Sequence, residues 1–192
     1  FKSLCLTVDT VVAGNRERDH KWGFTTPPKL TLKSIMSFAA HPKWAFNYLT
    51  HKKFELANVS HWTKKGSSIA KGVMEYINEQ YDPAMSWKDA EYVVKKWGGP
   101  FALKGVMSVE DAKRAIDIGA SAILLSNHGG RQLDGSRSPF DQLPVIKDAV
   151  GDKLEIILDG GIRRGTHVLK AISLGATACS FGKGFLFALG AG

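Results

Sequence analysis

Short apolar runs alternate with helical segments along most of this chain, and this alternation constrains the fold more than any other feature. Aliphatic and β-branched residues concentrate in five runs, at residues 4–8, 101–104, 122–125, 155–158 and 178–181. Helical patterns stand at about 86–97, 108–118, 141–150 and 164–173, and a last helix starts after 182–184. Buried strands separated by helices are typical of a parallel sheet in an α/β protein.

The lengths of the crossovers and the absence of a GxGxxG turn favour a TIM (β/α)8 barrel over a dinucleotide-binding fold. In a barrel, catalytic groups stand at the C-terminal strand ends, and the loops after the seventh and eighth strands hold phosphate. Here glycine-rich basic loops follow the last two predicted strands, at 159–165 and 182–184. Counting back, the chain covers roughly strands 4 to 8. We therefore expect a C-terminal fragment that is unstable and inactive without the first three strands.

Residues 22–82 show no strand pattern and are predicted to be a basic aromatic insertion within one partial-barrel domain, 1–192. Pro27 and Pro28 interrupt this segment, and helical pieces are predicted at about 31–39, 43–50 and 67–78. Lysines lie between its aromatic residues, which suits association with the surface of an anionic membrane. A solvated helical lid is the alternative interpretation.

The ends of the first four predicted strands carry polar residues that the fold itself does not require. They are Asp9 and Arg16 after the first run, Lys104 at the second, Ser126, His128 and Arg131 after the third, and Asp159 and Arg163 after the fourth. Taken singly, each is most simply a solvated loop residue or a local cap. Taken together on one rim of a barrel, they indicate a site.

The stretch 126–134, Ser-Asn-His-Gly-Gly-Arg-Gln-Leu-Asp, is the most informative of these loops. His128 can exchange a proton near neutral pH. Arg131 offers a planar fork of donors to a carboxylate or phosphate, and the glycine pair between them lets the backbone approach a ligand closely. A proton carrier beside an anion-binding group indicates an active site.

The net charge and the cysteine content limit which partners and ligands are expected. The net charge of +8 suggests an acidic partner, yet no nucleic-acid-binding motif is present, so a nucleic-acid module would rest on charge alone. Cys5 and Cys179 both fall in predicted buried strands, which favours small core residues in a reducing compartment over metal binding.

These motifs closely resemble the FMN-dependent 2-hydroxy-acid oxidases and dehydrogenases. Residues 126–134 match that family's active-site signature, and three further landmarks follow its order: 7–10 with 16–17, 103–105, and 159–165. The resemblance covers essentially the whole chain. The region containing Trp22, Pro27-Pro28 and 81–87 looks most like the L-lactate dehydrogenase branch, which passes electrons to a respiratory quinone or cytochrome.

The resemblance implies a role for each residue. His128 would be the base that removes a proton from the substrate, with Asp9 orienting its ring and stabilising the imidazolium. Arg16 and Arg131 would bind the substrate carboxylate. Lys104 would stabilise the reduced flavin. The other implied FMN contacts are Thr7, Ser126, Asp159, Gly160, Gly161, Ile162, Arg163, Gly182 and Lys183, and no metal is implied.

Two departures from the family are expected to matter. Lys183 stands where the family usually has arginine, so a bidentate phosphate contact becomes a point charge and FMN binding should weaken. The N-terminal half, which in the family supplies substrate-contacting tyrosines and part of the flavin pocket, is not in this sequence.

The predicted function is therefore oxidation of an L-2-hydroxy acid, most simply L-lactate, to the 2-oxo acid through FMN. An oxidase that passes electrons to oxygen and a flavin-free phosphate-binding barrel lyase or isomerase are the alternatives. The resemblance also implies a homo-oligomer, in the cytoplasm and peripheral on the inner face of the cell membrane.

Overall fold

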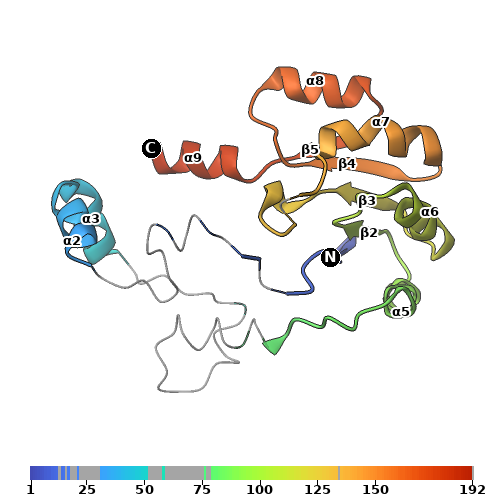
Figure 1. Cartoon of the computed structure of the whole chain (residues 1–192), viewed down its shortest axis with the longest axis horizontal. Coiled ribbons are helices and arrows are strands. Elements are labelled where there is room, and N and C mark those ends of the chain that lie inside the picture. The colour runs from blue at the N-terminus through green and yellow to red at the C-terminus, as the bar shows by residue number, and fades with distance from the viewer. Residues whose placement is uncertain are drawn as a thin grey trace. The chain divides into compact units, whose positions relative to one another are not determined.

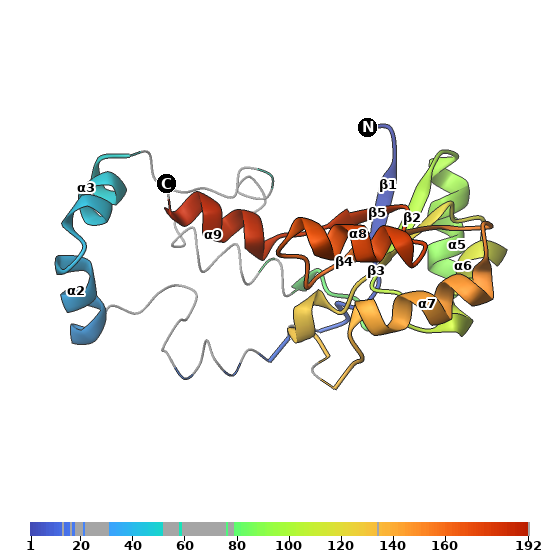
Figure 2. The same cartoon turned by 90° about the horizontal axis from the view of Figure 1, so that it is seen from above.

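A computed structural model describes residues 1–12, 14, 15, 17, 21, 31–51, 58, 76, 79–133 and 135–191. The chain divides into two compact units, one made of residues 1–15 with 82–192 and the other of residues 16–81 (Figures 1 and 2). Arg16 and most of the predicted helix at 67–78 lie outside the described residues.

One parallel sheet forms the frame of the first unit. Among the described residues it holds five strands: β1 (Leu4–Thr7), β2 (Phe101–Lys104), β3 (Ala122–Leu125), β4 (Glu155–Asp159) and β5 (Ala178–Ser180). The spatial order is the chain order, and every neighbouring pair is parallel. A doubly wound sheet reverses its order at a switch point, whereas a barrel wall does not. The predicted barrel and its strands are confirmed: the unit is part of a (β/α)8 barrel.

Five helices follow these strands in the described residues, and a serine caps the start of three of them. The helices are α5 (Trp87–Trp97), α6 (Val109–Asp117), α7 (Pro139–Val150), α8 (Gly165–Ser173) and α9 (Lys183–Ala191). At α5, Asp89 accepts hydrogen bonds from the Ser86 N–H (2.8 Å) and hydroxyl (2.7 Å). The Ser108 hydroxyl accepts from the Asp111 N–H at the start of α6. Helix α7 begins two residues earlier than predicted, because Pro139 fits the first turn.

The core lies between one face of the sheet and helices α5–α8, which cover that face (Figure 1). The strand register aligns Leu103, Ile123 and Ile156 on this face, and all three are almost fully buried. The alternate residues point the opposite way, because successive side chains in a strand alternate between faces. Thr7, Lys104 and Leu124, for example, occupy the opposite face and are only partly buried.

The expectation that Cys5 lies in the core is wrong. Cys5 is exposed, whereas Cys179 is half-buried against the core. The physical reason is position: β1 pairs only with β2 in the described sheet, and Cys5 stands between Leu4 and Leu6, which contact the core from the other face. The apolar surroundings still raise the pKa of the Cys5 thiol, and the nearby Lys104 charge partly offsets this.

The second unit contains two described helices, α2 (Leu32–Ala39) and α3 (Pro42–Thr50), close to the predicted ranges. None of the residues described in these helices is buried. Their aromatic rings pack on one another instead: Trp44 stacks on Phe38 at 5.2 Å and on Tyr48 at 5.3 Å between ring centroids. Within the described parts of the chain, no helix combines the length and apolar character needed to cross a membrane.

Candidate active site

The predicted polar residues gather at the C-terminal ends of the parallel strands. Thr7 ends β1 and pairs with Lys104 at the end of β2, while Asp159 ends β4. Ser126 follows β3 directly and is almost completely buried. Because parallel strands all end at the same edge of the sheet, these residues share one rim although the sequence separates them widely.

His128 and Asp9 form a short polar contact on this rim. The His128 Nδ1 lies 2.5 Å from the Asp9 Oδ2, and both side chains are largely shielded from solvent. On the other side of the ring, the Lys104 Nζ donates to the His128 Nε2 at 2.9 Å. This network assigns the proton to Nδ1 and the lone pair to Nε2. Asp9 thus fixes the ring so that Nε2 is the nitrogen able to accept a proton.

A second set of contacts joins the rim from β2 to β4. The Ser126 hydroxyl donates to Asp159 Oδ2 at 2.7 Å and accepts from the His128 N–H at 3.2 Å. The Lys104 ammonium lies 3.3 Å from the Ser126 Oγ and 3.6 Å from the Asp159 carboxylate. Lys104 is therefore a cation held between an imidazole and a carboxylate, with its charge balanced by Asp159.

The loop after β3 is a short 3-10 turn, His128–Gly130, whose conformation is held by a residue that sequence analysis did not single out. The Asn127 side-chain oxygen accepts from the N–H groups of Gly129 (3.0 Å) and Gly130 (3.2 Å). His128 has a left-handed backbone, with φ of 53°. The signal for this role was present, because asparagine commonly bonds the backbone two residues ahead in turns.

This turn also contacts the loop that follows β1. The Gln132 side chain donates to the Val12 carbonyl at 2.5 Å. Gly14 lies against the Arg131 carbonyl oxygen, so closely that a side chain at position 14 would overlap it. Arg131 stands on the turn beside His128 as predicted, but its proposed partner Arg16 lies outside the described residues.

The loops after β4 and β5 enclose a cavity of about 380 Å³ beside His128. Its lining includes every predicted residue of the two loops, namely Asp159, Gly160, Gly161, Ile162, Arg163, Gly182 and Lys183. No described atom lies within 4 Å of where a side chain at Gly160, Gly161 or Gly182 would begin, so the backbone is open to a ligand. Helix α9 begins at Lys183, and the N-terminus of a helix attracts anions. The cavity therefore suits a phosphate group.

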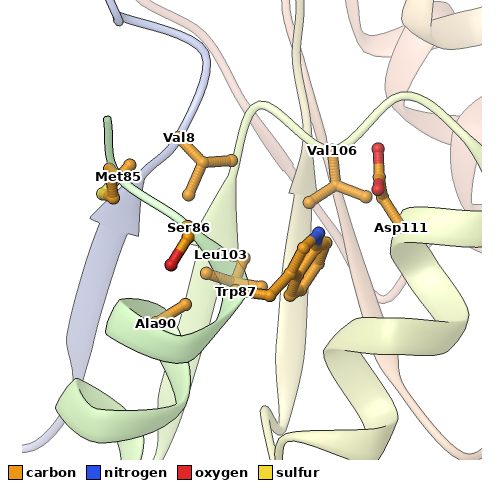
Figure 3. A pocket seen from close by; sticks show the side chains of 8 residues that line it. All are labelled: Val8, Met85, Ser86, Trp87, Ala90, Leu103, Val106 and Asp111. Carbon is orange, nitrogen blue, oxygen red and sulfur yellow. The ribbon is translucent and has the colours of Figure 1, made fainter. Parts of the chain in front are cut away.

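A separate pocket of about 200 Å³ lies on the helix-covered face and contains none of the predicted site residues. Figure 3 shows Trp87 and Ala90 of α5 on one side of it, with Val8 and Val106 beside them. Within the described ranges, no three or more histidine, cysteine or acidic side chains are grouped to hold a metal ion.

The fold and this rim place the chain among the (β/α)8-barrel proteins whose polar side chains gather at the C-terminal ends of the strands. Within that class, the chain belongs to the FMN-dependent dehydrogenase family, whose profile matches residues 1–192.

Comparisons with individual proteins agree with the family assignment. The chain is 41% identical over 189 residues to the L-lactate dehydrogenase of Yersinia pestis, covering 98% of this chain and 49% of that protein. Among solved structures, the monotopic membrane protein (S)-mandelate dehydrogenase superposes with a TM-score of 0.90 at 34% identity, covering 100% of this chain and 50% of that one. Mandelate oxidase superposes with a TM-score of 0.69 at 33% identity, covering 99% of this chain and 45% of that one. The chain thus spans about half the length of the relatives it matches.

The residues present fit FMN, the cofactor of this family. The cavity lining includes open glycine backbone, Arg163 and Lys183, which suits the phosphate. The Lys104 cation and the Ser126 hydroxyl lie along the same rim, at the other side of Asp159. Family dependence on FMN thus favours a flavin over the flavin-free lyase or isomerase considered above.

Proposed function

We propose that the complete protein oxidises an L-2-hydroxy acid, with L-lactate as the first candidate, to the 2-oxo acid and passes the electrons to a respiratory quinone or cytochrome. The single observation that carries this proposal is the aligned set Asp9–His128–Lys104, with contacts of 2.5 and 2.9 Å on the two ring nitrogens. The L-lactate dehydrogenase relatives support lactate as the substrate.

The residues of this chain would divide the work of binding FMN. Arg163, Lys183 and the glycines of the two loops would hold the phosphate, and Asp159 and Ile162 the adjoining chain. Thr7 and Ser126 would hydrogen-bond the ring system, with Lys104 near its edge. Bound FMN would supply two-electron acceptance, which no side chain provides.

His128 would act as the base, because its Nε2 faces away from Asp9 and carries the lone pair, which in this structure accepts a hydrogen bond from Lys104. The proton would come from the substrate hydroxyl or its α-carbon. The Asp9 carboxylate, 2.5 Å from Nδ1, would stabilise the imidazolium that results. Arg131, on the same turn, would bind the substrate carboxylate together with Arg16 and so orient the α-carbon.

The test is His128→Gln in the full-length protein, followed by stopped-flow measurement of flavin reduction by L-lactate. We expect the rate to fall by about 10²- to 10⁴-fold, with FMN content unchanged. His51→Gln, at an exposed position just after α3, is the matched control and should reduce at the wild-type rate. Near-normal reduction by the His128 variant would refute the base. A colourless wild-type protein that ignores hydroxy acids would refute the function itself.

An oxidase is the second candidate, and the likeness to mandelate oxidase favours it. The two readings differ only in where the electrons go. Stoichiometric hydrogen peroxide during turnover in air would support the oxidase. Turnover that needs an added quinone or cytochrome, with little peroxide, would support the dehydrogenase.

The proposal includes peripheral attachment to the inner face of an anionic membrane through residues 22–82. Supporting it are the exposed apolar side chains of α2 and α3, such as Phe46 and Leu49, and the monotopic membrane neighbour. Full-length protein should cosediment with vesicles of anionic lipid, and Phe46→Ser with Leu49→Ser should weaken this. Leu169→Ser, equally exposed on α8, should not. Equal sedimentation of all three would contradict the attachment.

The proposed homo-oligomer follows from the family resemblance. Light scattering of the purified full-length protein would test it, and a monomer mass at micromolar concentration would contradict it.

A further inference from the structure

Gly105, in the turn directly after β2, lies against the carboxylate of Asp9. A Cβ atom on Gly105 would stand 2.5 Å from both Cγ and Oδ1 of Asp9 and 2.7 Å from its Cβ. Separations below 3.0 Å essentially never occur for a real Cβ. The space that a side chain would fill at position 105 is therefore occupied by the acid that contacts His128.

We infer that Gly105 is a positioning residue for the proposed base. Its missing side chain lets the Asp9 carboxylate lie where Oδ2 reaches the His128 Nδ1 at 2.5 Å. The expected effect of Gly105 on turnover rests on the proposed function. The expected effect on the contact between Asp9 and His128 rests on geometry alone.

Asp9 has little freedom to move aside. The Val8 N–H donates to the Lys104 carbonyl at 2.9 Å, which ties the backbone before Asp9 to the end of β2. The Asp9 Oδ1 is buried, and no described residue hydrogen-bonds it. The Gly105 N–H donates to the Leu124 carbonyl at 3.1 Å, so the turn is also tied to β3. A side chain at 105 must therefore displace the carboxylate or break one of these strand-end bonds.

Other glycines show that backbone conformation alone does not explain this contact. Gly105 has φ of +102° and Gly119 has φ of +87°, and both values disfavour other residues. At Gly119 the only described atom near an added Cβ is a Val94 methyl at 3.7 Å, an ordinary contact. Gly119→Ala thus reproduces the backbone strain of Gly105→Ala without its clash, at the end of α6.

The first experiment compares these two variants in the full-length holoenzyme. Gly105→Ala should lower kcat for L-lactate by about 10- to 100-fold, because it disturbs the base rather than removing it. KM for L-lactate and FMN content should stay near the wild-type values. Gly119→Ala should change kcat less than twofold. If both variants keep wild-type kcat, or both lose it equally, the inference is wrong.

A double-mutant cycle asks whether Gly105 acts through Asp9. Asp9→Gly is the suitable partner, because it removes all three atoms that an alanine at 105 would meet. In the Asp9→Gly background, Gly105→Ala should cause no further loss of kcat. If Gly105→Ala alone folds poorly, Asp9→Gly in the same chain should restore soluble, FMN-containing protein. An equal fold-loss in both backgrounds, or failure of this rescue, would overturn the inference.

A readout independent of turnover separates this inference from the proposed function. Proton NMR of the full-length protein should show a low-field signal from the His128 Nδ1–H, held by Asp9. The signal should persist in Gly119→Ala and be lost or shifted in Gly105→Ala and Asp9→Gly. An unchanged signal in Gly105→Ala would refute the positioning role even in a fully active enzyme. A wild-type protein that shows the signal but oxidises no hydroxy acid would refute only the function.

Discussion

The two faces of the sheet differ sharply, although the same short strands form both. Leu103, Ile123 and Leu158 point toward the helices and are fully buried. One residue further along the chain, Lys104 and Asp159 point the opposite way and carry the contacts of the candidate site. Alternation along a four-residue strand thus assigns stability to one face and chemistry to the other. Substitutions one residue apart should therefore have separable effects.

The largest expected effect is on the helix-covered face. Leu103→Ala in the full-length protein should lower the free energy of unfolding by about 2–5 kcal/mol, because it leaves a cavity in the core. FMN bound to the folded fraction should still be reduced at a normal rate. Denaturant unfolding and stopped-flow reduction measure the two quantities. Leu169→Ala, at an exposed position of α8, is the control. A wild-type unfolding curve for Leu103→Ala would contradict the assignment of stability to the helix-covered face.

The next effect falls on the opposite face. Lys104→Met should slow flavin reduction by about 10²-fold, because the cation that contacts His128 and Asp159 is lost. Its unfolding midpoint should fall less than that of Leu103→Ala, since Lys104 lies on the face opposite the core and its side chain keeps some contact with solvent. Thermal unfolding and stopped-flow reduction would show this. A strongly lowered midpoint with normal reduction would reverse the assignment of the faces.

Ser126 tests where the separation ends, because it is buried and yet belongs to the site. Ser126→Ala removes a hydroxyl that donates to Asp159 and accepts from His128. We expect a loss of about 1–3 kcal/mol in unfolding free energy together with slower flavin reduction. If Ser126→Ala changes only the unfolding free energy or only the reduction rate, the effects on stability and on catalysis are separable at this residue too. Chemical denaturation and reduction kinetics on the same sample would decide.

A smaller effect is expected at the cavity proposed to bind the FMN phosphate. Lys183→Arg should tighten FMN binding by a few-fold, equivalent to about 1 kcal/mol, because guanidinium binds phosphate through two parallel hydrogen bonds. Fluorescence titration of the apoprotein with FMN measures the change. Lys170→Arg, on the exposed side of α8, should leave the affinity unaltered. Equal affinities for wild type and Lys183→Arg would place the phosphate away from residue 183.

The smallest effect is expected at Asp89, which lies on a helix and on neither face of the sheet. Hydrogen bonds from Ser86 lower the pKa of the Asp89 carboxyl below its ordinary value of 3.8. A lowered pKa contributes stability that is present above the ordinary value and disappears as the pH falls through the lowered one. Asp89→Asn should therefore have a slightly lower unfolding midpoint at pH 7, and the difference should vanish in acid. A difference that grows in acid would contradict the cap.

Sequence analysis predicted the strands because each is a short apolar run, and the helices predicted at 86–97 and 108–118 do begin beside the capping residues Ser86 and Ser108. It also brought Asp9, Lys104, His128 and Asp159 to one rim, since parallel strands end together. Roles of individual residues remain predictions. The contacts of Gly105 with Asp9 and of Gln132 with Val12 were not predicted. Such contacts join residues about a hundred positions apart and depend on strand register, which composition does not reveal.

The misassigned Cys5 illustrates the same limit. An apolar run predicts a strand, but which of its residues meet the core depends on neighbouring strands and on the direction of each side chain. Leu4 and Leu6 contact the core, whereas Cys5 between them does not.

The left-handed backbone at His128 has a consequence for how this protein can change. Histidine adopts φ of 53° at some expense in conformational energy, whereas glycine or asparagine would adopt it readily. Selection for thermal tolerance alone would thus favour replacing the residue proposed to take the proton. At this turn the backbone torsion of His128 therefore sets thermal stability against the proposed proton transfer.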